Sequence, residues 1–375
     1  MKVLFLTTAH KYNDDRIYYH QATELMKRGF DVKICSLCSD FQGEINNIKI
    51  ESYPILSSGT KEKVNTFLKV CQDYQPDSII CSEPLAVIAA RKFNKSKKTN
   101  ITYDITEWYP SFRMIEEYSF FLRFIHAIKF FLIQIYAGFL SHNFIFGEKT
   151  KKFPLAYFFP FKKNMILPYY PDHIYIHESK KSLDPNKINL CYTGVFSKEK
   201  GIGNFFEAVN QLQQERPNLQ IDVTLIGGSR RKIDEVYFSE LLKKYNKFNI
   251  NIEKPTSFEN FTKAYANVDI CFDLREISLE NHHCLPIKIF YYAASGKPVI
   301  YTDLKATRQF VEVSKFGFLV DPENALQIAD CIGKYIDNPN LYSTHVHNAR
   351  MLYEEKYNWD MIRDSFVDFV KNSIK

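Results

Sequence analysis

The sequence predicts two α/β domains, each built around a doubly wound parallel sheet, and three observations support this class. The chain has 375 residues, which is more than two domains of roughly 150 residues each. Apolar β-type runs alternate with helical patterns along most of the chain, as in parallel sheets covered on both faces by helices. The alternation begins again after a polar stretch near the middle. We expect the two domains to face each other across a cleft lined by the carboxyl ends of strands.

The composition agrees with this class and excludes several others. Hydrophobic residues make up 45% and charged residues 25% of the chain, which excludes a disordered, collagen-like or coiled-coil protein. The 49 Lys and Arg exceed the 43 Asp and Glu by six. This excess suits an anionic substrate or an anionic membrane surface, and no basic recognition module for nucleic acid accompanies it. Aromatic residues reach 15%, more than two cores need.

The cysteines and the N-terminus indicate a cytoplasmic protein without a metal site. Most of the eight cysteines lie in apolar runs, as small buried side chains of a reducing compartment do. Cys35 and Cys38 form a CxxC motif, but no second pair lies at zinc-ribbon spacing. The apolar run Val3–Leu6 is too short for the core of a signal peptide.

The first domain is expected to span residues 1–170. Buried strands are predicted at Lys2–Thr7, Asp31–Ser36, Asp77–Ser82 and Thr99–Tyr103. The helical periodicity predicts helices at Ile17–Arg28 and Lys61–Asp73.

A linker at 171–186, rich in Pro, His, Lys and Ser, is expected to precede a second domain at 187–355. Its predicted strands are Lys187–Tyr192, Gln220–Ile226, Asn249–Ile252, Ile270–Phe272 and Pro298–Tyr301, and its predicted helices are Gly203–Glu215, 258–266 and 286–295. A helix over 356–375 is expected to close the chain.

The loop from Tyr192 to Gly203 is a candidate anion site, because it follows a strand and opens a helix. Gly194 would allow the backbone to approach a phosphate closely, and Lys200 could add a positive charge. The same loop carries Phe196, and Gly227 ends the next strand. The alternative is an ordinary strand-to-helix loop with solvated lysines.

The segment 284–300 is a second candidate. Pro286 suits the first turn of a helix that Gly296 and Pro298 end. Lys288 would then lie in the first turn, where a cation opposes the helix dipole unless an anion binds nearby. The alternative is a lysine turned out to solvent.

Two polar loops of the first domain are candidates for binding sugar hydroxyls. Asp104 and Glu107 follow the strand at Thr99–Tyr103 and lie beside aromatic residues, although Glu107 could instead cap a neighbouring helix. The loop 10–16 also follows a strand, although Asp14 or Asp15 could serve only as the N-cap of the next helix. His10 in such a loop is more often a solvated side chain than a base.

Several motifs are absent from the sequence. It has no DxD, no GxxxxGK[ST], no GxGxxG in the first βαβ unit and no GxSxG. Phosphate binding by backbone and lysine, without a metal, is the chemistry that remains.

Taken together, these residues resemble the GT-B retaining glycosyltransferases of glycosyltransferase family 4, particularly bacterial enzymes of capsule and surface-polysaccharide assembly. The resemblance is carried by Thr7–Gly29, Tyr103–Pro110, Tyr192–Gly201, 284–300 and Tyr357–Trp359. The segment 284–300 is the most specific, being similar to the family's Pro-x-Lys, Phe-Glu-Tyr and Gly-x-Pro-Val-Ile. The final helix resembles the one that returns to the first domain in that family.

The resemblance implies transfer of a sugar from a nucleotide-sugar donor with retention, without a metal or other cofactor. It places the donor in the second domain, at Gly194, Phe196, Lys200, Gly227, Pro286, Lys288 and Tyr291. It places the acceptor against the first domain, near Asp14, Arg16, Thr106 and Glu107. Stabilisation of the departing diphosphate would be the main catalytic effect, with Glu107, Lys200 and Lys288 as the catalytic residues.

This sequence departs from the family pattern at three positions. The two family glutamates separated by seven residues fall on His283 and Tyr291. A phenol cannot accept two hydrogen bonds from the donor ribose as a carboxylate can. Thr106 stands where many members have a histidine. We therefore expect altered or weaker recognition of the nucleotide.

The aromatic excess is concentrated in residues 118–161. The stretch 118–140 places Arg123, His126, Lys129 and Gln134 on one arc of a helix that is otherwise apolar. A second stretch of rings and lysines follows, and we expect Phe158, Phe159, Lys162 and Lys163 to contact an anionic membrane surface. The alternative is a core helix followed by a loop. Membrane contact would place the protein peripherally on the inner face of the cell membrane and would suit a polyprenyl-linked saccharide acceptor.

Two other functions stay open from sequence. A nucleotide-sugar epimerase uses a similar cleft but no acceptor. A non-catalytic, glycosyltransferase-like subunit that supports a partner enzyme would explain the missing acidic pair.

Overall fold

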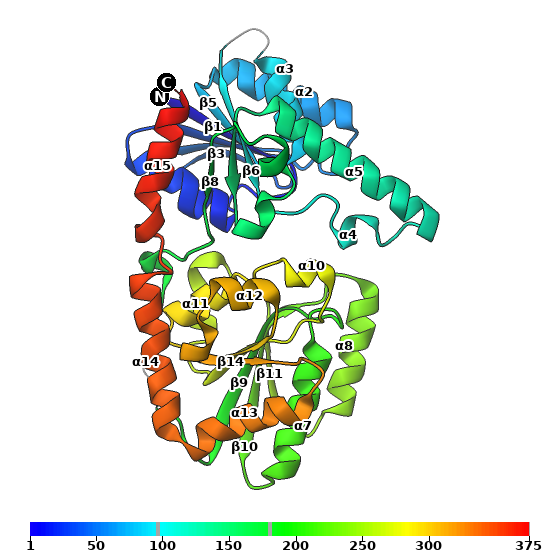
Figure 1. The fold of residues 1–375 in the computed structure, drawn as a ribbon, viewed down its shortest axis with the longest axis vertical. Helices are drawn as coiled ribbons and strands as arrows, with labels where there is room; N and C mark the ends of the chain where they lie inside the picture. The colour runs from blue at the N-terminus through cyan, green and yellow to red at the C-terminus, as the bar shows by residue number, and fades with distance from the viewer. Residues whose placement is uncertain (95–97, 179–181, 375) are drawn as a thin grey trace. The chain divides into compact units, whose positions relative to one another are not determined.

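The structure is a computed structural model, and it describes residues 1–94, 98–178 and 182–374. The chain divides into two compact units, which are described separately (Figure 1). Unit 1 comprises Met1–Tyr169 and the C-terminal segment from Asp360, and unit 2 comprises Tyr170–Trp359. Part of the expected linker, residues 179–181, lies outside the described residues.

Unit 1 is built on an eight-stranded sheet with the order β3-β4-β2-β1-β5-β6-β7-β8. All neighbours are parallel except β3 and β4, which form an antiparallel edge. The strands are β1 (Lys2–Thr7), β2 (Asp31–Ser36), β3 (Phe41–Ile45), β4 (Ile48–Ser52), β5 (Ser78–Cys81), β6 (Asn100–Ile105), β7 (Asn143–Phe146) and β8 (Asn164–Ile166). The central strands are buried almost throughout, as expected for a sheet covered on both faces.

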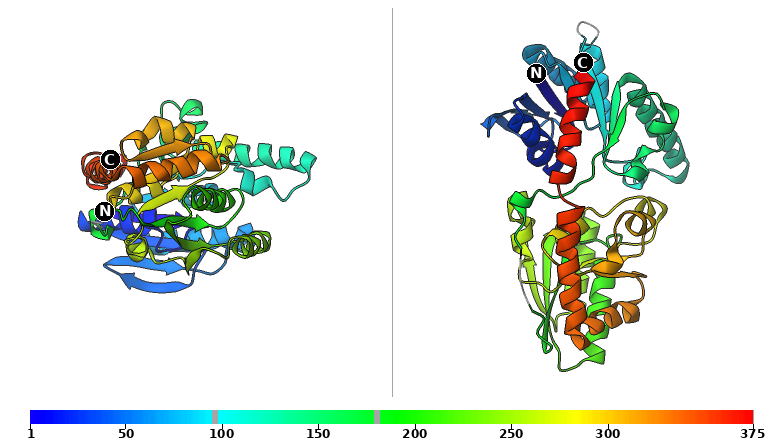
Figure 2. Two further views of the ribbon diagram at one scale, coloured as in Figure 1. Left: turned by 90° about the horizontal axis from the view of Figure 1, so that it is seen from below. Right: turned by 60° about the vertical axis from the view of Figure 1, so that its left-hand side comes forward.

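Helices cover both faces of the unit 1 sheet. One face forms a hydrophobic core with α2 (Thr60–Tyr74), α3 (Pro84–Phe93), one side of α5 (Phe120–Leu140) and α6 (Leu155–Phe158). The short α4 (Phe112–Ile115) precedes α5. The other face is covered by the segment after β1 and by α15 (Asp360–Ile374), which contacts α1 (Thr23–Lys27) and β5 (Figure 2). The expected return of the last helix to the first domain is therefore confirmed.

The helix expected at Ile17–Arg28 begins earlier and has two parts. Its first part is a π-helix, η1 (Asp15–Ala22), in which the backbone N–H of Thr23 donates to Tyr18 O five residues earlier. Asp14 caps it by accepting from the backbone N–H groups of Arg16 and Ile17. Such wider turns occur frequently at functional sites. Here the wider turn follows the polar loop after β1.

Unit 2 contains a six-stranded parallel sheet with the order β11-β10-β9-β12-β13-β14. Its strands are β9 (Lys187–Val195), β10 (Gln220–Gly228), β11 (Asn249–Glu253), β12 (Ile270–Asp273), β13 (Val299–Thr302) and β14 (Gly317–Val320). Because every pair is parallel, the carboxyl ends of β9, β10, β12 and β13 lie at one edge. This is the edge at which open α/β sheets bind ligands.

The unit 2 helices form one core on each face of the sheet. One core contains α7 (Ile202–Glu215), part of α8 (Lys232–Lys244) and α13 (Ala325–Asp337). The other contains α11 (Lys288–Ala294), α12 (Lys305–Phe310) and α14 (Pro339–Glu355). The short α9 (Phe261–Ala264) packs on the second core, and α10 (Leu279–His282) precedes α11. All eight cysteines are free thiols, and six are buried, as expected.

Helix α5 differs from the other helices because most of its apolar surface is exposed. Only Gln134, Ala137 and Gly138 are buried, and the helix extends beyond the sheet of unit 1 (Figure 1). By length and composition it is the one helix among the described residues that could cross a membrane, with a mean hydropathy of 1.5 in its most apolar window.

Candidate functional site

The carboxyl edge of the unit 2 sheet is shaped by two glycines that lie opposite each other in neighbouring strands. Gly194 lies at the end of β9 and Gly227 at the end of β10, with φ angles of 116° and 148°. A Cβ on Gly227 would lie 1.9 Å from the carbonyl oxygen of Gly194. No side chain fits between the two strand ends, so the backbone itself forms the floor of this edge.

Lys288 lies directly in front of this floor. A Cβ on Gly194 would lie 2.8 Å from Lys288 Nζ, so the lysine occupies the space that the glycine leaves. Its ammonium group donates to the carbonyl oxygen of Thr193 and lies 3.9 Å from Asp273 Oδ2. A cation in the first turn opposes the helix dipole, but α11 has only seven residues, so this dipole is small. The ammonium group is also bound by the end of β9 and by Asp273, which offsets the unfavourable interaction.

A buried ion pair lies behind Lys288. Arg275 Nε and Nη2 donate to the two carboxylate oxygens of Asp273 at 2.7 and 2.6 Å. Burial alone would raise the pKa of Asp273, but the charges of Arg275 and Lys288 lower it overall. Burial is the largest effect on the pKa of Lys288, and it lowers that pKa although Asp273 opposes it. Two cations, Arg275 and Lys288, therefore lie beside one carboxylate, that of Asp273. The carboxyl edge of the sheet keeps a net positive charge here, which suits an anion.

Lys200 lies in the loop after β9, as predicted, but its ammonium group has a partner. It donates to Glu199 Oε1 at 2.6 Å, and its backbone carbonyl accepts from Tyr192 OH at 2.8 Å. Both charged side chains are partly exposed. Such pairs contribute little to stability, so an anion could replace Glu199 at small cost.

Phe196 and Pro286, both predicted to bind the donor, have structural roles. Phe196 is a core residue at 1% exposure, and its ring packs 4.6 Å from that of Phe238. The ring therefore faces the core, and a contact of Phe196 with the donor stays a prediction. Pro286 is buried just before α11 and its carbonyl accepts from Ile289 N, so it shapes the start of that helix.

Tyr291 is packed inside unit 2 rather than displayed at the edge of the sheet. It is 5% exposed, and its ring contacts Phe258 and Phe261 at centroid distances of 6.0 and 5.8 Å. Where the resembling family has a carboxylate, this chain therefore has an aromatic cluster. Its contact with a donor ribose stays a prediction.

In unit 1, the carboxyl edge of the sheet carries a cluster of charged groups centred on His10. His10 Nδ1 lies 2.9 Å from Asp14 Oδ2, and its Nε2 lies 3.8 Å from Glu83 Oε1. Glu83 follows β5 and is itself fixed, because it accepts from Thr7 Oγ1 and from the backbone N–H groups of Thr8 and Ala9. The loop after β1 is thereby tied to the end of β5.

The charges in this cluster shift one another's pKa values. Burial would lower the pKa of His10, but Asp14, Glu83 and Glu107 together raise it to about 9. Burial and the charge of Asp14 raise the pKa of Asp15 to about 7. Burial likewise raises the pKa of Glu83. At neutral pH the His10 ring is thus an imidazolium held among carboxylates, with 30% of its side chain exposed.

Glu107 also belongs to this cluster, because its charge acts on His10; its contact with an acceptor stays a prediction. It follows β6 together with Thr106, and both are partly exposed. The neighbouring Trp108 ring lies 5.9 Å from the ammonium group of Lys151. Carboxylates beside an aromatic ring are a common arrangement for binding sugar hydroxyls, and here they lie at the ligand-binding edge of the sheet.

Arg16, predicted on the acceptor side, is buried in an ion pair, and its contact with an acceptor stays a prediction. It is 4% exposed, and its guanidinium donates to both oxygens of Asp104 at 2.8 Å and to Leu167 O at 2.7 Å. Its charged group also lies 4.6 Å from the Tyr169 ring centroid. Arg16 and Asp104 instead join η1 to β6 and to the end of β8.

The four residues predicted to contact a membrane fall into two groups. Phe158 is 56% exposed and Lys163 is also exposed. Phe159 instead packs against the core of unit 1, and Lys162 Nζ donates to the carbonyl oxygens of Gly138, Phe139 and Ser141. Lys162 thus satisfies the C-terminal carbonyls of α5, a position that favours a cation.

Two parts of the candidate site were not predicted. Glu83 precedes a helix-forming stretch, and no motif marks it; its role depends on backbone N–H groups of a loop 74 residues away. Asp273 and Arg275 follow a predicted strand end, and that position was the signal that could have identified them. Among residues 1–94, 98–178 and 182–374, no group of three or more His, Cys, Asp or Glu is arranged to hold a metal ion.

The two α/β units and their strand orders define the GT-B fold, and solved structures agree. Sucrose-phosphate synthase from Thermosynechococcus elongatus is similar over 99% of both chains, with a TM-score of 0.73 and 14% identity. HepE of Anabaena in complex with UDP-glucose is similar over 99% of this chain and 100% of its own, also with a TM-score of 0.73 and 14% identity. WaaG, a glycosyltransferase involved in lipopolysaccharide biosynthesis, is similar over 99% of both chains, with a TM-score of 0.71 and 13% identity.

Part of unit 2 matches a known protein family in sequence. Residues 187–338 match the family described as glycosyl transferases group 1. This segment includes both strand-end glycines, the Asp273–Arg275 pair and Lys288. A comparison with curated proteins found no match.

Proposed function

We propose that the protein is a glycosyltransferase that transfers a sugar from a nucleotide-sugar donor to a saccharide acceptor. The observation that carries this proposal is the meeting of Gly194, Gly227 and Lys288 at the carboxyl edge of the sheet, within the segment that matches glycosyl transferases group 1. The similarity to HepE with bound UDP-glucose and to WaaG supports it.

In this proposal the diphosphate of the donor binds in front of Gly194. The bond to Thr193 uses one of the three N–H groups of the Lys288 ammonium. The remaining donors and the charge of Lys200 are available for phosphate oxygens. As the bond to the sugar breaks, negative charge grows on the departing diphosphate, and these fixed cations stabilise it.

The Asp273–Arg275 pair holds Lys288 in place for this task. Asp273 attracts the ammonium group from 3.9 Å, while Arg275 balances the carboxylate. With Arg275 in place, Asp273 does not present an unopposed negative charge to the donor. We assign both residues as positioning residues rather than catalytic ones.

The His10 cluster serves the acceptor. The imidazolium of His10 is hydrogen-bonded to Asp14 through Nδ1, and the charges of Glu83 and Glu107 also act on it. Glu107, which is partly exposed, accepts from an acceptor hydroxyl, and the Trp108 ring packs against the sugar face. We propose retention of configuration, metal-independent transfer and a role in bacterial polysaccharide assembly, as the resemblance implies, and a polyprenyl-linked acceptor, which contact with a membrane would suit.

Product analysis tests the proposal. The purified chain is incubated with UDP-, GDP- and CMP-sugars, with and without saccharide acceptors and with a chelator present. The proposal predicts a glycoside whose anomeric proton coupling matches that of the donor, formed only when acceptor is present. An isomerised nucleotide sugar formed from donor alone would establish the epimerase instead.

One observation favours the non-catalytic alternative. Tyr291, at the position of a family glutamate, is packed among rings. A chain that binds no nucleotide sugar but copurifies with a second transferase would establish that function.

A further inference from the structure

The exposed apolar surface of α5 and α6 has no described role in the proposed function. On α5, exposed apolar side chains recur every three or four residues, which places them along one stripe of the helix. The stripe comprises Phe121, Phe124, Ile125, Ile128, Leu132, Tyr136 and Phe139, each 46–82% exposed. Isolated exposed apolar residues are ordinary, but a continuous stripe of this length indicates an interaction surface.

The surface continues from α5 onto the segment around α6. The Phe131 and Phe158 rings meet with centroids 6.3 Å apart, and the C-terminal end of α5 is bound by Lys162. Beyond α5 the most exposed rings are those of Tyr157 and Phe161, at 73% and 99%. We call the α5 stripe together with Phe153, Tyr157, Phe158 and Phe161 the α5–α6 surface.

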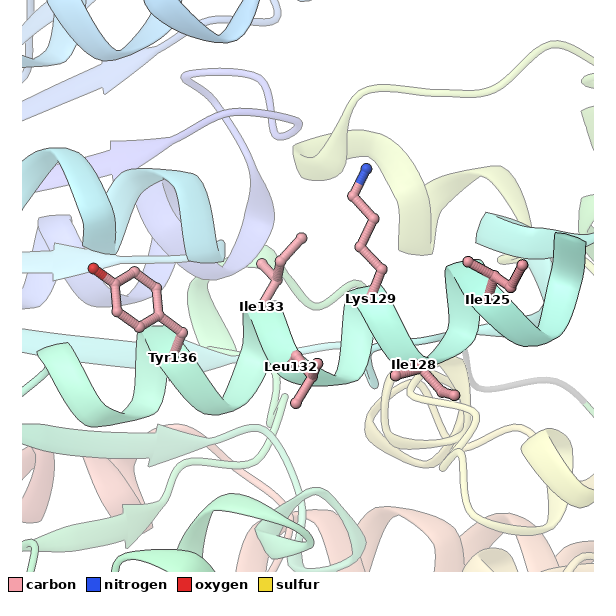
Figure 3. A pocket seen from close by; sticks show the side chains of 6 residues that line it. All are labelled: Ile125, Ile128, Lys129, Leu132, Ile133 and Tyr136. Carbon is pink, nitrogen blue, oxygen red and sulfur yellow. The ribbon is translucent and has the colours of Figure 1, made fainter.

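The depression on this surface is open and shallow, unlike a cavity that encloses a small ligand. All the residues that line it come from the single helix α5: Ile125, Ile128, Lys129, Leu132, Ile133 and Tyr136 (Figure 3). A broad, shallow apolar surface fits an extended partner better than a small molecule.

The charge around the surface identifies that partner. Residues 118–171 contain seven Lys and Arg but a single acidic residue, Glu148. This segment therefore carries a formal charge of +6, equal to the net charge of the entire chain. Glu148 is itself paired with Lys151 at 3.5 Å. Lys129, Lys149 and Lys163 are exposed and can meet anionic headgroups while the rings enter the acyl boundary.

We infer that the α5–α6 surface docks on an anionic lipid bilayer, with α5 lying in the plane of the interface. Spanning is disfavoured because Gln134, Ala137 and Gly138 pack against unit 1 and hold α5 on it. Arg123 likewise ties the start of α5 to the preceding loop by donating to the carbonyl of Tyr118. The inference goes beyond the proposed function and is independent of it, because docking requires no sugar substrate.

Vesicle flotation of the full chain tests this inference. Phosphatidylcholine vesicles with and without phosphatidylglycerol are compared, and we expect binding only when the anionic lipid is present. Phe121→Ser with Phe124→Ser should lower the partition coefficient about tenfold or more, since each ring loses its lipid contact. Lys129→Glu with Lys149→Glu should lower it by a similar factor, and added salt should weaken binding of the unmodified chain.

Matched controls come from unit 2. Ile233→Ser with Leu326→Ser, and Lys232→Glu with Lys243→Glu, change exposed residues of the same kinds on α8 and α13 and should leave flotation unchanged. Unaltered thermal unfolding shows that each variant is folded. Absent flotation, or equal binding to both vesicle types, would overturn the inference. Retention on vesicles after an alkaline wash would also overturn it, because it indicates a spanning helix. A dimer in sedimentation equilibrium that the Phe121 and Phe124 substitutions dissociate would overturn it as well, because the surface would then be a dimer interface.

Discussion

Lys288 Nζ lies 2.8 Å from the position that a Cβ of Gly194 would occupy, so the absence of a side chain at one residue makes room for the cation of the other. These residues are far apart in the sequence, and the parallel sheet of unit 2 brings them together. We assign this pair to the binding site for the donor diphosphate.

Gly194→Ala should disturb both the backbone and Lys288. The φ of 116° is strained for any side chain, which costs roughly 1–2 kcal/mol, and the new methyl group displaces the ammonium group. We expect a lower free energy of unfolding in urea and weaker donor binding by calorimetry. Gly228→Ala is the matched control, since nothing lies within 4 Å of its Cβ. Equal losses in the two variants would count against a special role for Gly194.

Arg16→Met should destabilise unit 1 by about 3–5 kcal/mol, because it leaves the buried Asp104 carboxylate without its cation. Urea unfolding measures the loss. Adding Asp104→Leu should recover part of it, since the uncompensated charge is then removed. If Arg16→Met were fully stable but raised the KM for the acceptor, the predicted place of Arg16 on the acceptor side would be supported instead.

The stability of unit 1 should fall as the pH rises from about 6.5 to 9. The folded-state pKa of His10 is raised from 6.5 to about 9, so the stabilisation from its bound proton is complete below 6.5 and is lost through 9. We expect a loss of roughly 1–2 kcal/mol after solvent screening.

The titration of Asp15 also lowers the stability of unit 1 as the pH rises, but over a lower pH range. Its folded-state pKa is raised to about 7. The stabilisation from the proton bound to Asp15 is therefore complete below about pH 4 and is lost as the pH rises through 7. His10→Asn should therefore flatten the decline between pH 6.5 and 9 in urea unfolding and leave the part below pH 6.5 in place. An unchanged slope above pH 6.5 in this variant would exclude His10 as its origin.

Tyr291→Phe separates ring packing from the hydroxyl group. The ring contacts with Phe258 and Phe261 are retained, so we expect unchanged thermal stability. If the hydroxyl binds the donor ribose, the donor Kd should rise about two- to tenfold. Tyr291→Glu restores the family carboxylate but buries it among rings, and it should lower the melting temperature. Tight UDP-sugar binding that Tyr291→Phe leaves unaffected would remove Tyr291 from the donor site.

The fold is largely predictable from the sequence because buried strands carry a local signal. The bounds of β1 and β2 agree with the prediction to the residue, since both are short apolar runs between polar positions. The β3–β4 hairpin was missed, although Asn46 and Asn47 with positive φ are a recognisable turn signal. Helix α11 is shorter than predicted at both ends: Ile287 is its N-cap residue, Pro286 lies in a tighter turn whose carbonyl accepts from Ile289 N, and Ser295 is the C-cap.

The site is predictable only in part, because the sequence does not show which way a side chain points. Gly194 and Glu107 lie at or just after strand ends and Lys288 is the first residue of a helix, positions that by themselves indicate a role. Phe196 and Arg16 occupy the same kinds of loop but turn inward. Glu83 could not be found, since its partners come from a loop that only the folded sheet brings near.

Isothermal titration of the full chain with UDP-, GDP- and CMP-sugars is the decisive test of the donor site. We expect binding of at least one nucleotide sugar and a Kd raised at least about tenfold by Lys288→Ala, since a charge-assisted contact to phosphate is lost. The exposed control Lys232→Ala should leave the Kd unchanged. Binding that Lys288→Ala leaves untouched, or binding of none of the nucleotide sugars, would contradict the assignment of this site.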